Sequence, residues 1–296
     1  MTRRRKALSR RQFLAAAGGT AAALTVPGRG RASAPALREN AFSMLVDTTR
    51  CIGCRSCVRA CERANRLPVD EAVSDRPGPG PRLETAWNRW TTVNTEAEPG
   101  AGGMPPVFVK RQCMHCLEPA CVSVCPVGAM YQTELGPVIY RAERCFGCRY
   151  CMISCPFDVP KFQWDSGLVP VIGKCQFCFQ DRLLSGLSPA CAEACPTGAL
   201  KFGTREQTLF DAHARIRARP DRYHARVFGE EEAGGTCWLY LSDRPFDRLG
   251  FRKDLDRGSL PSLTWMVISR IPTVAAALAI LFGVVAGGLK REEHGP

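Results

Sequence analysis

The chain has 296 residues, 17 cysteines and a formal net charge of +12. So many cysteines exclude an ordinary cytosolic enzyme, and their regular spacing excludes a secreted disulfide scaffold. Basic chains often bind nucleic acid, but no nucleic-acid motif and no run of interleaved aromatic residues accompanies this charge, so we expect no nucleic-acid partner.

The N-terminal segment accounts for most of the excess charge. Residues 1–31 contain eight basic residues and no acidic one, which leaves +4 for the rest of the chain. Ser9–Leu14 has the twin-arginine pattern, and a weakly apolar stretch follows it. Such signals are addresses read by a receptor, not membrane anchors. We therefore predict a twin-arginine signal region over residues 1–36, with Ala32–Ala34 and Ala34–Ala36 as alternative cleavage motifs.

Sixteen cysteines form four tight groups between residues 40 and 202. The first and third groups share the spacing C-x-x-C-x-x-C-x-x-x-C, with a glycine before and an arginine after the second cysteine. The second and fourth groups align when Pro119–Cys121 is placed on Pro189–Cys191, so the order is A, B, A′, B′. In chain order the groups are Cys51, Cys54, Cys57 and Cys61; Cys113, Cys116, Cys121 and Cys125; Cys145, Cys148, Cys151 and Cys155; and Cys175, Cys178, Cys191 and Cys195.

This spacing predicts metal ligation by thiolates. A structural zinc site usually takes its ligands as two separated pairs, whereas each group here supplies three close thiolates and a fourth just beyond them. The pattern favours iron–sulfur clusters, and in two-cluster ferredoxins the fourth cysteine of each run ligates the other cluster. We therefore predict four 4Fe-4S clusters in two bacterial-ferredoxin units. We also expect basic residues beside the motifs, such as Lys174, to offset the negative charge of the clusters.

Further elements are predicted around and beyond the cysteine groups. The insert over residues 62–112 contains Pro/Gly-rich loops. Thr204–Gln207 has the form of a capping box, so we predict a helix from Arg205 to Arg219, ended by Pro220. A short strand is predicted over Thr236–Ser242.

Two residues near this chemistry stand apart from the pattern. Cys237 belongs to no group, and we expect it to be a small buried apolar residue. His115 lies inside the second group, and we expect a loop histidine near the surface. The sequence has no nucleophile–base pair, no phosphate loop and no flavin or nicotinamide fingerprint, so we expect no catalysis by this chain alone.

The C-terminal segment is predicted to cross a membrane. Ile271–Leu289 contains 19 residues without a charge. A helix of that length reaches roughly 28 Å, close to the hydrocarbon thickness of a bilayer. Trp265 has an interfacial position before it, and Lys290 and Arg291 follow it. A buried helix of a soluble core is the alternative.

The sequence resembles the four-cluster iron–sulfur subunits of membrane-bound respiratory oxidoreductases. Within these it is most similar to the electron-transfer subunit of hydrogenase-2-type NiFe hydrogenases. The closer resemblance rests on five segments, Gln112–Cys116, Cys121–Val127, Cys148–Met152, Phe202–Glu206 and Gly234–Thr236. It implies an α+β fold of two bacterial-ferredoxin-like 2×(4Fe-4S) units with loop insertions, followed by a C-terminal transmembrane helix.

The resemblance also implies how the cysteines pair. The first and fourth groups would share two clusters, and the second and third groups would share the other two. Cluster 1 would be held by Cys51, Cys54, Cys57 and Cys195, and cluster 2 by Cys61, Cys175, Cys178 and Cys191. Cluster 3 would be held by Cys113, Cys116, Cys121 and Cys155, and cluster 4 by Cys125, Cys145, Cys148 and Cys151.

The function implied by the resemblance is a non-catalytic electron relay at the periplasmic face of the cytoplasmic membrane. Its partners would be hydrogenase small and large subunits and a multi-span quinone-reactive membrane subunit. The alternative is the iron–sulfur subunit of a molybdenum or tungsten enzyme such as a formate dehydrogenase, although the twin-arginine signal favours the hydrogenase type. A cluster-bearing assembly factor is a third, less favoured hypothesis, because four complete motifs imply permanent ligation.

The expected domain organisation follows from these segments. The signal region covers residues 1–36, the four-cluster ferredoxin-like domain 37–202, a C-terminal extension of the soluble domain 203–262, the membrane anchor helix 263–289 and a short cytoplasmic tail 290–296.

Overall fold

The computed structural model describes residues 40–69, 82–96, 105–166 and 171–292, with side chains as far as Gly283. The chain divides into two compact units, of which the larger extends over Ser33–Pro261 and the other includes the C-terminal segment from Ser262. The predicted signal region, residues 70–81 and residues 97–104 lie outside the described residues, and so do most of the Pro/Gly-rich loops.

A three-stranded sheet forms the centre of the larger unit. β1 (Phe42–Asp47) lies between β8 (Leu200–Thr204), to which it is antiparallel, and β9 (Trp238–Leu241), to which it is parallel. Leu45 of β1 packs against residues of helix α8 (Arg205–Ala218) on one face of the sheet. Met44 packs into the main core on the opposite face. The strand is buried on both faces because apolar layers cover both.

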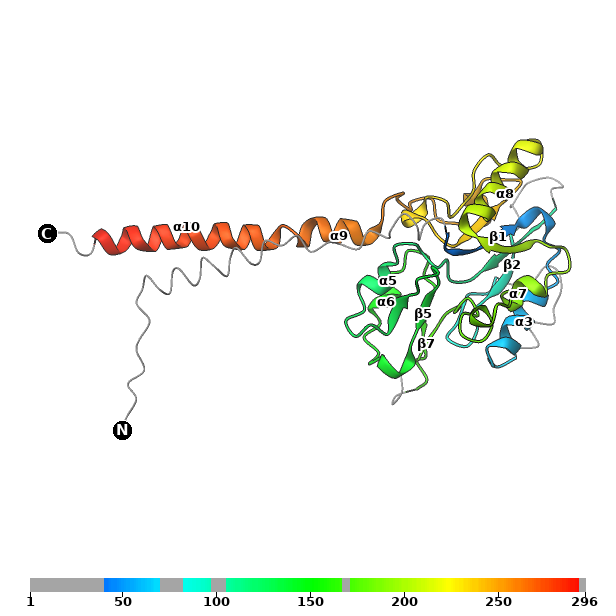
Figure 1. The fold of residues 1–296 in the computed structure, drawn as a ribbon, viewed down its shortest axis with the longest axis horizontal. Coiled ribbons are helices and arrows are strands. Elements are labelled where there is room, and N and C mark those ends of the chain that lie inside the picture. The colour runs from blue at the N-terminus through cyan, green and yellow to red at the C-terminus, as the bar shows by residue number, and fades with distance from the viewer. Residues whose placement is uncertain (1–39, 70–81, 97–104, 167–170, 293–296) are drawn as a thin grey trace. The chain divides into compact units, whose positions relative to one another are not determined.

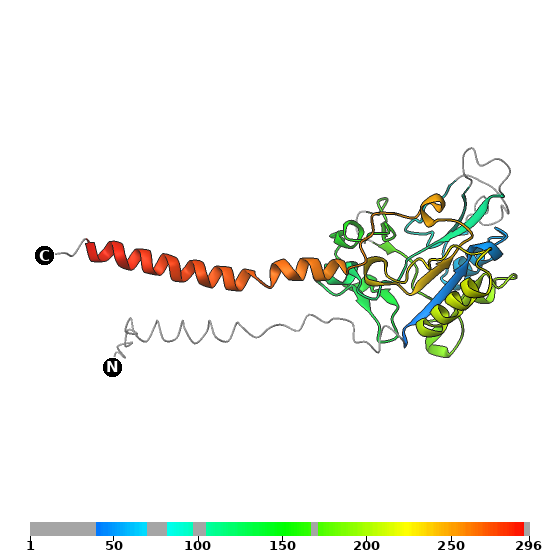
Figure 2. The same cartoon turned by 90° about the horizontal axis from the view of Figure 1, so that it is seen from above.

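Helix α8 (Arg205–Ala218) covers one face of this sheet and lies along β1 (Figure 2). It begins with the predicted capping box. The Thr204 side chain accepts a hydrogen bond from the backbone N–H of Gln207, and the Gln207 side chain accepts one from the backbone N–H of Thr204. The predicted helix and the predicted strand around β9 are therefore both confirmed, each to within a residue or two.

The repeat of the sequence is visible in the backbone. Gly53 and Gly147 have φ of 69° and 81°, and the arginines that follow the second cysteine are left-handed N-caps of the next helix, with φ of 56° at Arg55 and 63° at Arg149. These helices are α3 (Ser56–Ala64) and α6 (Tyr150–Ile153). The corresponding helices after the Pro-Ala motifs are α5 (Ala120–Ser123) and α7 (Ala190–Glu193).

The helix of the first cysteine group packs against that of the fourth group, and the helix of the second group packs against that of the third. Helix α3 packs against α7, and α5 packs against α6 (Figure 1). The first and fourth cysteine groups are therefore neighbours, and so are the second and third groups.

In the described part of the larger unit there are also three two-stranded ribbons and five 3-10 helices. The ribbons, all antiparallel, are β2 (Thr92–Glu96) with β3 (Val107–Arg111), β4 (Met130–Gln132) with β5 (Val138–Tyr140), and β6 (Lys161–Phe162) with β7 (Ile172–Gly173). The 3-10 helices are Thr48–Arg50, Ala142–Arg144, Leu183–Ser185, Glu232–Gly234 and Phe246–Leu249. The first two directly precede Cys51 and Cys145, so the repeat extends to the entry of each cysteine loop.

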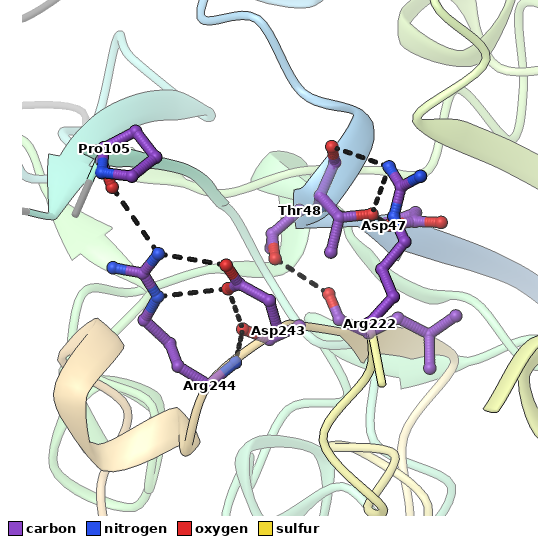
Figure 3. A network of polar contacts seen from close by, with 9 residues as sticks. Asp47, Thr48, Pro105, Arg222, Asp243 and Arg244 are labelled. Carbon is purple, nitrogen blue, oxygen red and sulfur yellow. Dashed lines mark hydrogen bonds and ion pairs between the residues drawn. The ribbon is translucent and has the colours of Figure 1, made fainter. Parts of the chain in front are cut away.

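A polar network joins the C-terminal extension to β1 (Figure 3). The carboxylate of Asp47 is fully buried and accepts hydrogen bonds from Arg215 Nη1 and from the Tyr223 hydroxyl, both at 2.8 Å. Nearby, Arg222 donates to the carbonyl and hydroxyl oxygens of Thr49, at 3.4 and 3.3 Å. The extension is thus part of the same compact unit as the cysteine groups.

The C-terminal segment is helical as far as the structure describes it. Helix α9 (Leu260–Ile268) is followed by a short break at Arg270 and by α10 (Ile271–Glu292). Leu260–Gly283 is long and apolar enough to cross a membrane, with a mean hydropathy of 1.9, and it is the one such stretch among the described residues. Its most apolar window is not buried within the chain.

Candidate metal centres

The loops that carry the cysteines are shaped by glycine and by short helices. Gly53 lies between Cys51 and Cys54 with φ of 69°, and a Cβ there would lie 2.5 Å from the Phe108 ring. Glycine is therefore required by both its backbone conformation and the close approach of a side chain. Helix α3 then places Cys57 and Cys61 four residues apart on one face.

The first set brings together Cys51, Cys54, Cys57 and Cys195, which line one cavity together with Lys110 and Thr197. Burial raises the pKa of Cys51, the backbone N–H of Gly53 lowers it, and the charges of Cys195 and Cys54 raise it further. These four residues, called set 1 here, are the ligands expected for cluster 1.

Set 2 consists of Cys61, Cys175, Cys178 and Cys191. Burial raises the pKa of Cys61 well above its usual value, and the charge of Cys175 raises it further. The other thiols of the set, Cys191 and Cys178, act on Cys61 in the same direction. Hydrogen bonds to sulfur in this set include those from Asn65 Nδ2 to Cys61 at 3.5 Å and from the backbone N–H of Phe177 to Cys175 at 3.3 Å.

Set 3 consists of Cys113, Cys116, Cys121 and Cys155. Burial raises the pKa of Cys116 well above its usual value, and the charges of Cys155, Cys121 and Cys113 raise it further. Burial also raises the pKa of Cys155 to about 11, although the backbone N–H groups of Val159 and Phe157 lower it.

Set 4 consists of Cys125, Cys145, Cys148 and Cys151. Burial raises the pKa of Cys151 to about 12, and the charges of Cys145, Cys148 and Cys125 act in the same direction. The backbone N–H of Met130 donates to Cys125 Sγ at 3.4 Å. Each of the four sets therefore combines three cysteines of one group with the last cysteine of another.

The four sets follow one another in space. Cys57 of set 1 is an electrostatic neighbour of Cys191 of set 2. Cys175 of set 2 is a neighbour of Cys113 of set 3. Cys121 of set 3 is a neighbour of Cys151 of set 4. The order in space is therefore 1, 2, 3, 4, as a relay requires.

The donor chemistry of these sets fits iron–sulfur clusters. Four thiolates are soft ligands of the kind that iron–sulfur clusters and zinc prefer. Among the described residues, no group of three or more His, Cys, Asp or Glu closes around a single metal ion. The cysteines of set 1 line one cavity, and each set offers the four thiolates that one 4Fe-4S cluster takes. Ligation of one cluster by each set stays a prediction.

The prediction for His115 is wrong, because this residue is fully buried. Its Nδ1 accepts a hydrogen bond from the backbone N–H of Val138 at 2.9 Å, and its ring packs edge-on against Phe177. Burial lowers the pKa of His115 well below its usual value, and the charge of Lys174 lowers it further. The ring is therefore neutral, and the left-handed backbone at φ of 48° turns it inward.

The prediction for Cys237 is confirmed, since the residue is fully buried beside the second cysteine group. Its backbone N–H donates to the carbonyls of Met114 and His115.

One buried cation at the cysteine sets is not indicated by any sequence motif. Lys110 is only 3% exposed and lines the cavity of set 1. It lies on β3, inside the insert for which no strand was predicted. Lys110 directly follows the short apolar run Val107–Val109, which does not alternate between apolar and polar residues.

Known proteins are similar to this chain in sequence. The chain matches 4Fe-4S dicluster domain families over residues 50–129 and 105–205. It is 41% identical to a protein of Nitratidesulfovibrio vulgaris, over 97% of this chain and 78% of that protein. It is 34% identical to the hydrogenase-2 operon protein HybA of Escherichia coli O157:H7, over 86% of each chain. It is 35% identical to the iron–sulfur subunit of the nitrate-inducible formate dehydrogenase of Escherichia coli K12, over 71% of this chain and 72% of that subunit.

Proposed function

This chain belongs to the family of iron–sulfur electron-transfer subunits with 4Fe-4S dicluster domains, and we propose that it relays electrons between a periplasmic NiFe hydrogenase and a quinone-reactive membrane subunit. The observation that carries the proposal is the succession of four cysteine sets through one compact unit. The clusters supply one-electron transfer when bound, and each set would hold one of them.

The protein's own part in this relay is to hold and insulate the clusters. Cysteines of sets 2, 3 and 4 are buried, among them Cys61, Cys113, Cys151 and Cys191, whereas the cysteines of set 1 are half-buried. Because the thiolate is the ligand, burial in the absence of metal keeps the thiols protonated, so cluster binding must release protons. The N–H groups that point at Cys51, Cys125 and Cys175 stabilise the negative sulfur, which raises the reduction potential.

The C-terminal helices support a membrane location. We propose that α10 anchors the chain, with the cysteine sets on the periplasmic side after export by the twin-arginine route. That route carries folded proteins, which suits a chain whose clusters are assembled before it leaves the cytoplasm.

A formate dehydrogenase is the second candidate for the catalytic partner. The chain is 33% identical to the formate dehydrogenase-O iron–sulfur subunit of Escherichia coli K12, over 90% of each chain. This sequence identity is nearly the same as that with HybA, so it does not favour either function. The catalytic subunit that binds this chain decides between them.

The test is anaerobic purification of the tagged chain from membranes with its partners attached. We expect nickel in the complex, about sixteen irons per chain from four 4Fe-4S clusters, and hydrogen-dependent reduction of a soluble quinone. If the complex contains molybdenum or tungsten and reduces quinone with formate, the catalytic partner is a formate dehydrogenase and not a hydrogenase. Zinc in place of iron, or about eight irons, would contradict the four-cluster relay.

A further inference from the structure

Lys110 is a buried ammonium group whose place is fixed from several sides. It lies on β3 with 3% of its surface exposed. Its Nζ donates to the hydroxyl of Thr91 and, at 3.0 Å, to Oε1 of Gln112. The same Nζ lies 4.6 Å from the centre of the Trp238 ring, which itself is buried.

Both acceptors are held in orientation by further bonds. The Thr91 hydroxyl donates its proton to the carbonyl of Arg111 at 3.1 Å, so its lone pairs face Lys110. The Gln112 amide nitrogen donates to the Tyr240 hydroxyl at 2.7 Å, and that hydroxyl donates to the carbonyl of Lys110 at 2.9 Å. The amide oxygen must therefore point at the ammonium group. Such a network holds the charge at one position and prevents it from swinging towards solvent.

Neutral oxygens do not balance a buried charge. An unpaired ion inside a protein costs several kcal/mol. Four cysteines are the main electrostatic neighbours of its Nζ, namely Cys191, Cys57, Cys175 and Cys61. These four cysteines belong to set 1 and set 2, and none of the four groups is a carboxylate.

The geometry points to Lys110 as the shared counter-charge of sets 1 and 2, fixed between them so that it raises the reduction potentials of both clusters together. This inference rests on the proposed function, because it requires a cluster in each of the two sets. A positive charge close to both sets favours the reduced, more negative state of each.

A second buried lysine provides the matched comparison. Lys174 is fully buried, and its Nζ donates to the carbonyls of Val138 and Cys175. The charge of Lys174 lowers the pKa of Cys121 in set 3, whereas Lys110 is not among the main causes of the shift of that pKa. Both lysines therefore lie near set 2, but Lys110 lines the cavity of set 1, whereas Lys174 acts on set 3.

The test is a redox titration of the anaerobically purified complex, with dithionite as reductant and electron paramagnetic resonance as the readout. In Lys110→Met, which keeps the length of the side chain but removes its charge, two of the midpoint potentials should become more negative. Lys110→Arg should restore them at least in part. Lys174→Met should leave the midpoint potential of set 1 unchanged and shift that of set 3. Because Lys110 is buried, the shift should persist at high salt, unlike that of a surface charge.

Iron analysis separates failure of this inference from failure of the proposed function. A wild-type chain without 4Fe-4S clusters would remove the function itself. A Lys110→Met chain with full iron content and unchanged midpoint potentials would overturn the inference alone, and so would an equal shift of all four. If Lys110→Met loses iron, Thr91→Val keeps the charge but removes one anchor. This milder variant should shift the same two midpoint potentials by a smaller amount, and no shift would also overturn the inference.

Discussion

Cys61 illustrates how much depends on a single thiolate. It lies on the same helix as Cys57, yet its electrostatic neighbours are Cys175 and Cys191 of the fourth group. We therefore expect Cys61→Ala to disturb the cluster of set 2 and to leave that of set 1 intact. A cubane with three thiolates loses its unsupported iron or takes a weaker ligand, so one of the paramagnetic signals should change and quinone reduction should fall.

Cys237→Ala is the control for this substitution. Cys237 is equally buried but belongs to no set, so its variant should keep all four signals and full electron flow. Direct imaging gives the strictest check. Density that joins Cys61 to the cluster of Cys51, Cys54 and Cys57 would refute the crossed pairing.

Gly53 is a second residue at which one atom decides the local structure. A Cβ at this position would meet the Phe108 ring at 2.5 Å, and the backbone is left-handed at φ of 69°. We expect Gly53→Ala to destabilise the fold by about 2 kcal/mol or more, since left-handed strain and a clash add up. Thermal unfolding and the rate of iron release measure this effect.

Gly186 separates the two causes. Its φ is 73°, but no atom lies within 4 Å of the position of its Cβ. Gly186→Ala should therefore show only the backbone strain, about 1 kcal/mol. Equal effects of the two substitutions would show that Phe108 does not restrict the loop of set 1.

At the scale of elements, an ion pair joins α8 of the extension to the end of β1. Arg215 of α8 reaches the fully buried carboxylate of Asp47 at the end of β1. Arg215→Ala leaves this carboxylate without its cation, so we expect the free energy of unfolding to fall by about 3 kcal/mol. Denaturant unfolding of the purified chain measures the change.

Arg219 gives the matched control, because it forms an exposed pair with Asp221 near the end of the same helix. Exposed pairs contribute about 0–1 kcal/mol, so Arg219→Ala should change stability little. A comparable loss in both variants would mean that α8 itself, and not the bond to Asp47, was weakened.

Elements were predictable where their signals are local. The capping box of α8 and the glycines of the cysteine loops act within a few residues, and the structure has them where the sequence predicts them. The β2–β3 ribbon lacks such a signal, because its strands flank a Pro/Gly-rich stretch. Lys110 was missed for the same reason. Its burial comes from Trp238 and Tyr240, which lie far away in the sequence.

At the scale of the whole molecule, the repeat was predictable but the central sheet was not. The order A, B, A′, B′ follows from spacing alone, whereas the pairing of the groups was implied by a resemblance. The parallel pairing of β1 with β9 joins segments almost two hundred residues apart, with Leu45 opposite Leu239. No local pattern specifies such a partner, because it depends on how both strands bury their apolar faces.

Export of the chain is predicted to depend on the twin arginines. We expect the double substitution Arg10→Lys and Arg11→Lys to leave the protein in the cytoplasm with its clusters assembled, because the receptor reads the arginine pair. Cell fractionation with an antibody against the chain measures this. Normal export of the variant would remove the twin-arginine claim, whereas loss of the protein from all fractions would call for a pulse-labelled repeat.

The orientation of the C-terminal helix follows from charge. Of the cations directly next to the apolar stretch, Lys290 and Arg291 follow it and Arg270 precedes it, and on these flanking charges we predict a cytoplasmic C-terminus. The cysteine sets would then lie outside, where folded export delivers them. An epitope added after Pro296 should resist protease in intact spheroplasts, while the cysteine-containing unit is digested, and both should be cleaved after lysis. Replacing Lys290 and Arg291 by Gln should weaken this bias without altering the iron content. Cleavage of the epitope in intact spheroplasts of the unsubstituted protein would contradict the membrane span, because a chain that does not cross the membrane exposes both of its ends on one side.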